Sequence, residues 1–144
     1  MPFDHQRPAP SFLSSRQAFA ALSLAALACD KAMDRDEVRT LKEQFLSRPA
    51  YAAMGDGELS DMFEGLLADL RHFGTDCIVR AAIPLLSQHQ CETSLAVVAQ
   101  LLMSNGQFSS DEKVFLDSLV SMMGLEAQRA STIVEVISLL FTDV

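Results

Sequence analysis

Two segments of this chain, residues 20–41 and residues 95–116, share one layout without a gap. The first reads AALSLAALACDKAMDRDEVRTL and the second LAVVAQLLMSNGQFSSDEKVFL. Each has an apolar helical stretch, an Asx residue, a short link, an acidic pair and the start of a second helix. Because solenoids need three or more repeats, a unit that occurs twice predicts two similar helical hairpins related by a pseudo-two-fold axis.

Composition and periodicity predict an all-α protein. The apolar fraction is 49%, and alanine, leucine and methionine, which favour helices, dominate over the residues that favour strands. At 144 residues the chain is expected to form one domain with a proper core. We therefore predict a single-domain bundle of about seven helices over residues 14–144, preceded by an N-terminal extension, residues 1–13.

The predicted helices follow from apolar periodicity and end signals. Asp56 and Thr75 are expected to cap the third and fourth helices, and Gly74 fits the end of the third. Ser87 with Gln90 forms a capping box for the fifth. The seven predicted helices span residues 14–29, 34–48, 56–73, 75–84, 87–103, 110–123 and 126–141.

The first and fifth predicted helices are apolar nearly all round, so they should lie in the core. Small residues such as Ala25 and Ala99 would let their backbones approach closely. The amphipathic pattern of the last helix predicts which of its residues face inward, namely Ala130, Ile133, Val134, Ile137 and Leu140.

Charge and motif content exclude several function classes. The net charge is −8 and the pI near 4.7, and no cluster of Lys and Arg is visible in the sequence, which argues against a nucleic-acid partner. A basic protein or a cation suits this charge better. Nucleotide-binding loops, a nucleophile elbow and a catalytic His set are absent from the sequence, so we expect no enzymatic activity.

Cellular location is predicted from cysteine usage and hydropathy. Cys29, Cys77 and Cys91 are widely spaced and lie in apolar helical contexts, which indicates reduced thiols in the cytoplasm. The apolar run of residues 18–28 is too short for a membrane span, and we interpret it as a buried helix without direct membrane insertion. Homodimer formation stays open.

The acidic links between the helices have two interpretations. As capping boxes, Asp34 with Glu37 and Ser109 with Glu112 satisfy the free amides of two helix starts. As a metal site, the oxygen-bearing residues of both links would converge on a hard divalent cation. Those candidate ligands are Asp30, Asp34, Glu37, Asn105 and Glu112. Capping explains the acids more simply, and the EF-hand ligand order is missing.

The same links resemble a known family. The segments ACDKAMDRDE (residues 28–37) and MSNGQFSSDE (residues 103–112), followed by MMGL (residues 122–125), resemble the repeated motif of the tellurite-resistance TerB family. TerB-like domains also occur in some DnaJ-type co-chaperones. The resemblance implies a seven-helix bundle without an established enzymatic activity, linked to tellurite and stress resistance, with a metal-binding or scaffolding role. The family's acidic positions correspond to Asp30, Glu37, Asn105 and Glu112.

Two functions follow as expectations. The first is a non-enzymatic TerB-like accessory module that binds another protein through its acidic face or an exposed apolar groove, without a cofactor. The alternative is weak binding of a divalent cation by the acidic links. Lys31 and Asn105 stand where the motif has glycine and aspartate, and both reduce the negative charge. This favours the interaction module.

Overall fold

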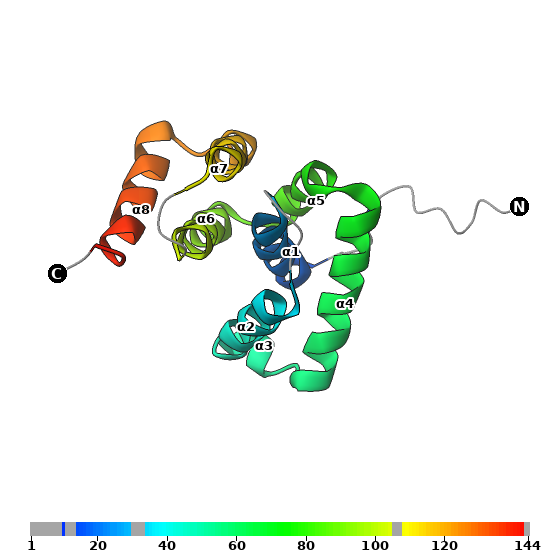
Figure 1. The fold of residues 1–144 in the computed structure, drawn as a ribbon. Helices are drawn as coiled ribbons and strands as arrows, with labels where there is room; N and C mark the ends of the chain where they lie inside the picture. The colour runs from blue at the N-terminus through cyan, green and yellow to red at the C-terminus, as the bar shows by residue number, and fades with distance from the viewer. Residues whose placement is uncertain (1–9, 11–13, 30–33, 105–107, 143–144) are drawn as a thin grey trace, which may run out of the picture.

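The computed structural model describes residue 10 and residues 14–29, 34–104 and 108–142 (Figure 1). All regular structure in these ranges is helical, which confirms the all-α class. Eight α-helices are present there instead of about seven, because an additional short helix begins at Pro49. The fixed φ of proline suits the first position of a helix. The helices are α1 (Ser15–Ala28), α2 (Arg35–Leu46), α3 (Pro49–Ala52), α4 (Asp56–Phe73), α5 (Thr75–Ala82), the 3₁₀ helix η2 (Ile83–Leu85), α6 (Gln88–Met103), α7 (Ser110–Met123) and α8 (Ala127–Leu139).

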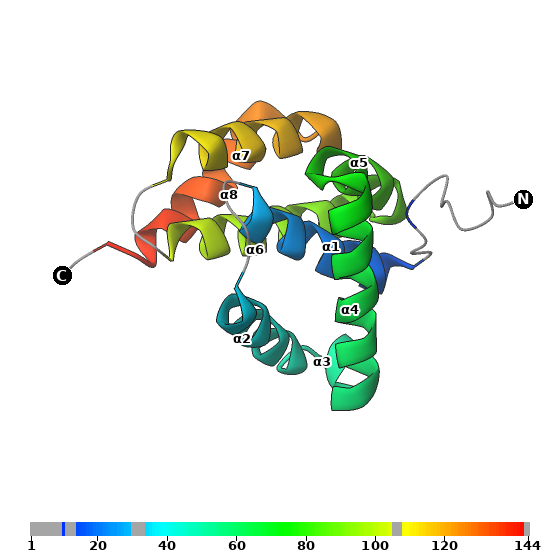
Figure 2. The ribbon, with the colours of Figure 1, turned by 45° about the vertical axis from the view of Figure 1, so that its right-hand side comes forward.

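Helices α1 and α6 form the centre of the core, as predicted. They pack against each other, and Figure 2 shows both lying roughly along α7 while α4 crosses them steeply. Ala25 and Ala99 are fully buried, so close approach of the two backbones depends on small side chains. Within the described ranges, no helix combines the length and apolar character needed to cross a membrane.

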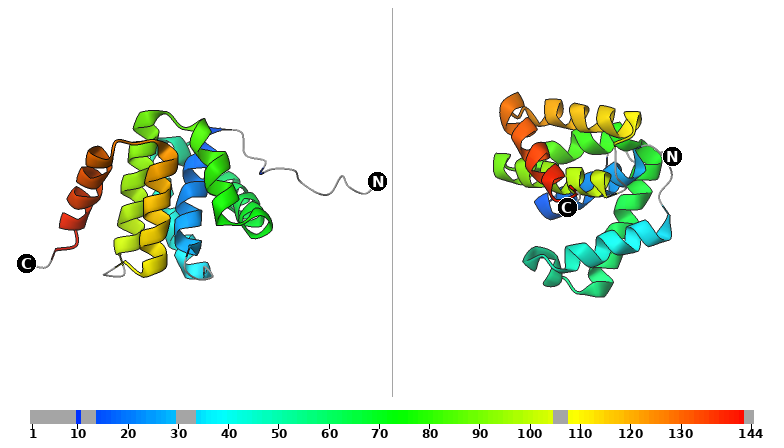
Figure 3. Two further views of the ribbon diagram at one scale, coloured as in Figure 1. Left: turned by 90° about the horizontal axis from the view of Figure 1, so that it is seen from above. Right: turned by 60° about the vertical axis from the view of Figure 1, so that its left-hand side comes forward.

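The hairpins α1–α2 and α6–α7 differ in how their second helices pack. Helix α7 lies along α6, whereas α2 makes few contacts with α1 and instead lies against α3 and α4. In Figure 3, right, α2 and the lower part of α4 extend away from the layer of α1, α6 and α7. Helix α2 therefore has partners along only part of its length.

An aromatic cluster fixes the C-terminal end of α2. The ring centroids of Phe45 and Phe63 are 5.7 Å apart in an edge-to-face arrangement, and those of Phe45 and Tyr51 are 4.7 Å apart. Phe19 joins the cluster, 5.7 Å from Phe45. Such pairs stabilise beyond their buried area, so α1, α2, α3 and α4 meet at this point.

A glycine joint separates α4 from α5. Gly74 has φ 87° and ψ 164° and serves as both the C-cap of α4 and the N-cap of α5. The predictions that Asp56 and Thr75 cap their helices are wrong. Each is the first helical residue instead, and the caps are Gly55 and Gly74. Gly55 and Gly74 have positive φ values, which glycine adopts readily because it lacks a Cβ atom. These glycines therefore occupy the cap positions, and Asp56 and Thr75 become the first helical residues.

Helix α8 is the least buried of the long helices. Ala130 is buried, and Ile133, Val134 and Ile137 are half-buried. The prediction that Leu140 faces inward is wrong, because its side chain is 65% exposed. The amphipathic pattern continues beyond the point where α6 covers α8, so the pattern overestimates burial near the C-terminus.

Candidate functional site

Helix α2 separates two surface pockets of opposite charge. Its residues at helical spacing, Arg35, Val38, Arg39 and Lys42, line a groove shared with α4. Its other face carries Asp36 and Glu37 into a pocket shared with α6 and α7. Because residues three and four apart share a helix face, this one helix presents cations to α4 and carboxylates to the opposite side.

The predicted capping boxes are present at the starts of both α2 and α7. The Glu37 amide donates to Asp34 Oδ1 at 2.8 Å, and the Asp34 amide donates to Glu37 Oε1 at 3.1 Å. The Glu112 amide donates to Ser109 Oγ at 3.1 Å, and the Ser109 amide donates to Glu112 Oε1 at 2.8 Å. These bonds satisfy amides that a helix start leaves without partners, so the capping interpretation is confirmed.

The predicted metal ligands are brought together only in part. Asp34, Glu37 and Glu112 line the same pocket of about 480 Å³, and each already uses a carboxylate oxygen in its capping box. In the part of the chain that the structure describes, no group of three or more His, Cys, Asp or Glu side chains is arranged to hold a metal ion. Asp30 and Asn105 lie outside the described residues.

The groove between α2 and α4 has a volume of about 820 Å³. Its apolar surface comes from Val38 of α2 and from Phe63, Leu67 and Leu70 of α4. Phe63 and Leu70 are buried, whereas Val38 and Leu67 are half-buried. The groove therefore has an apolar floor that is only partly covered by the protein itself.

One end of the groove is closed by Lys42. Its Nζ donates to Ser60 Oγ at 2.8 Å and lies 3.3 Å from a carboxylate oxygen of Asp56. The side chain of Lys42 is 23% exposed, so this bridge between α2 and α4 is partly shielded from water. Together with the Phe45–Phe63 pair, it anchors the C-terminal half of α2 to α4.

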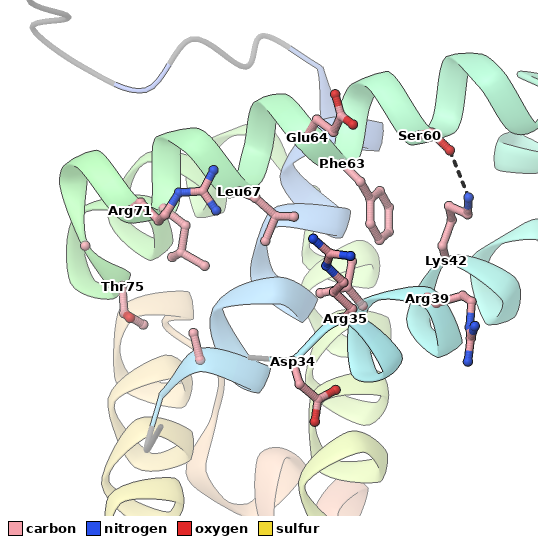
Figure 4. Close-up of a pocket in the computed structure, with 14 residues that line it drawn as sticks. Asp34, Arg35, Arg39, Lys42, Ser60, Phe63, Glu64, Leu67, Arg71 and Thr75 are labelled. Carbon is pink, nitrogen blue, oxygen red and sulfur yellow. Dashed lines mark hydrogen bonds between the residues drawn. The ribbon is translucent and has the colours of Figure 1, made fainter. Parts of the chain in front are cut away.

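Two guanidinium groups lie at the other end. The side chains of Arg35 and Arg71 make no hydrogen bond or ion pair with any residue in the described ranges. Figure 4 shows both groups between α2 and α4, with Leu67 between them in that view. Arg39, also on the rim, pairs with Asp36 at 3.0 Å. The rim thus contains cations that have no carboxylate partner within the described part of the chain.

The finding corrects the expectation that cations do not cluster. Four of the 11 Lys and Arg residues line this one groove. Arg35, Arg39 and Lys42 stand at i, i+4 and i+7, so helical spacing could have identified their shared face. Arg71 could not be added from the sequence, because its place beside them depends on how α4 packs against α2.

Two cations outside the groove provide a comparison. Arg80 Nε donates to Asp76 at 2.8 Å, and Arg129 donates twice to Glu92, at 3.0 and 3.1 Å. The hydrogen bond from Arg129 lowers the pKa of Glu92. Both arginines are satisfied within the protein, in contrast to Arg35 and Arg71.

Cys91 lacks the depressed pKa that makes a thiol reactive. Cys91 is buried in α6, and this burial raises the pKa of its thiol above the ordinary value for cysteine. Cys29 and Cys77 are half-buried. The groove between α2 and α4 is thus the candidate functional site.

Comparisons with protein-family models, curated proteins and solved structures found no match. The TerB-like resemblance therefore depends on the two motif segments.

Proposed function

We propose that this protein is a TerB-like accessory module that performs no chemistry of its own and binds another protein in the groove between α2 and α4. The observation that carries the proposal is the combination of a half-covered apolar floor with the guanidinium groups of Arg35 and Arg71, which have no partner in the described part of the chain. Unpaired cations beside apolar surface are suited to a partner that supplies both carboxylates and apolar side chains.

The shape of the groove favours a polypeptide over a small molecule. Along α4 its lining residues run from Ser60 to Arg71, which corresponds to about 16 Å of helix. Sites for small ligands usually enclose most of the ligand's surface, whereas this groove lies on the surface between two helices. A long surface groove with an apolar floor is the usual seat of an amphipathic helix.

We further infer that the hairpins α1–α2 and α6–α7 are the two members of a pseudo-two-fold repeat within a single domain. In the second hairpin α7 covers its partner helix, whereas in the first α2 lies against α3 and α4. This difference in packing supports a division of roles. The second hairpin completes the core, and the first provides the binding groove.

Divalent-cation binding by the acidic links remains the alternative. Asp34, Glu37 and Glu112 do line one pocket, but capping accounts for an oxygen of each. Hard cations of this type take six or more oxygen ligands. The groove proposal therefore has the stronger geometric support.

Site-specific photocrosslinking in the producing organism tests the proposal. A photoreactive phenylalanine derivative replaces Arg39 on the groove rim or, as the control, Arg80 on α5. The two positions are matched, because each side chain is 66% exposed and each belongs to a local ion pair. We expect a discrete crosslinked protein from position 39 that is absent from position 80 and is lost when Arg35 and Arg71 are both changed to Gln. Identical crosslinking patterns at both positions would contradict the proposal.

A further inference from the structure

Building on the proposed groove function, we propose that the partner segment is an acidic amphipathic helix. Its apolar face covers the floor of the groove, and its carboxylates meet the cations on the rim. The proposal specifies the sign of the partner's charge, which is opposite to what the net charge of −8 alone suggests. A protein with this net charge is expected to attract basic partners, but the local arrangement around α2 favours an acidic one.

The charges that line the groove are mainly positive. Arg35, Arg39, Lys42 and Arg71 contribute four cations, and Asp34 and Glu64 are the two acids among the lining residues. Asp34 uses Oδ1 to cap α2. Figure 4 shows the Asp34 and Glu64 carboxylates directed away from the space between α2 and α4. A carboxylate placed there would therefore face guanidinium groups, with no competing anion beside it among the residues that the structure describes.

The positions of these cations define the pattern of the partner. Arg35 and Arg71 belong to opposite walls at the open end, where a carboxylate can bond either guanidinium in a bidentate way. Arg39 extends the cationic rim along α2 toward the end that Lys42 closes. The apolar residues of the partner, spaced at i, i+3 or i+4, and i+7, then cover Val38 and Leu67. The expected motif is a helical apolar stripe flanked by Asp or Glu.

A polyanion without apolar groups satisfies only half of this surface. A nucleic-acid backbone or an inorganic phosphate can neutralise Arg35 and Arg71 but leaves Val38 and Leu67 exposed. The groove also lies between two helices that converge at Lys42, and this shape suits a rod-like ligand better than a flat membrane surface. Helix in groove is therefore the mode of binding that the chemistry and the shape both favour.

Selection from a displayed peptide library tests the inference. The library contains helical peptides of roughly 16 residues, about one turn longer than the groove, with random residues on one face. Peptides enriched on the wild-type protein are then measured against two charge-matched variants. The groove variant carries Arg35→Gln and Arg71→Gln, and the control carries Arg80→Gln and Arg129→Gln, so both lose two positive charges. A third variant, Leu67→Ser, tests the floor, with circular dichroism confirming that each variant is folded.

We expect enriched peptides with an apolar stripe flanked by Asp or Glu. Exposed ion pairs contribute modestly, so the groove variant should bind about 3- to 30-fold more weakly and the control less than about 2-fold more weakly. If the enriched peptides lack acidic residues but bind the groove variant more weakly, the partner is not acidic, and the proposed groove function is retained. If peptide binding is unaffected by both the groove variant and Leu67→Ser, the groove function itself is contradicted. Wild-type binding to phosphatidylserine vesicles that the groove variant loses, without any enriched peptide, would assign the groove to an anionic membrane surface and overturn the peptide proposal.

Discussion

Replacing Gly74 with alanine should destabilise the protein through backbone strain alone. The residue has φ 87° and ψ 164° at the joint between α4 and α5, a region that residues with a Cβ atom adopt at a cost of about 1–3 kcal/mol. A Cβ atom built at Gly74 meets no other atom within 4 Å. Steric overlap therefore adds nothing, and the whole loss comes from the conformation.

Gly65 provides a control in the same helix. It lies inside α4 with no atom within 4 Å of an added Cβ and without a positive φ. Because alanine is the better helix former by about 1 kcal/mol, Gly65→Ala should stabilise the protein. The two identical changes are thus expected to differ by roughly 2–4 kcal/mol, with opposite signs.

Denaturant unfolding followed by circular dichroism measures both free energies of unfolding, with wild type as the reference. In thermal melts, each kcal/mol should move Tm by about 3 °C for a chain of this size. A Gly74→Ala variant as stable as wild type would refute the strain argument, because it would show that α4 and α5 meet in a conformation open to any residue.

Three further results are expected. Glu112→Gln should leave stability unchanged with or without divalent cations, because Gln serves in the capping boxes of α1 and α6; a loss seen only with metal would favour the cation site. Ala99→Leu should destabilise by about 1–3 kcal/mol through overpacking, whereas Leu at the exposed Ala52 should have little effect in urea titrations. Burial, opposed by weaker effects of Arg48 and Arg16, raises the pKa of Tyr51 above its ordinary value of 10.0, so its contribution to stability is complete below pH 10 and is lost as pH rises above it. Tyr51 is the single tyrosine of the chain, so phenolate absorbance during alkaline unfolding reports on it alone; normal titration without unfolding would contradict this prediction.

Features determined by local sequence could be predicted well. The boxes Asp34–Glu37 and Ser109–Glu112 depend on residues three apart, and the start of α7 at Ser110 follows directly from one of them. The core position of Ala25 followed from an apolar pattern that leaves no polar face. These cases need no knowledge of how distant helices pack.

Features that depend on packing could not be predicted in the same way. Arg71 joins the groove because α4 crosses beside α2, although α3 separates the two helices along the chain. Leu140 fits an inward pattern, but no neighbouring helix covers it sufficiently. The sequence predicts that Gly74 ends α4, but it does not show that Gly74, and not Thr75, is also the N-cap of α5. In each case the outcome depends on geometry between elements.

The central claim is that the groove between α2 and α4 is the surface that binds a partner. Its most direct test is a nuclear magnetic resonance titration of the isotope-labelled protein with the partner segment recovered by crosslinking at position 39. We predict that the largest shift changes occur at groove residues of α2 and α4, including Val38, Leu67 and Arg71. Changes confined to α6, α7 and α8, with the groove signals unmoved, would contradict the account.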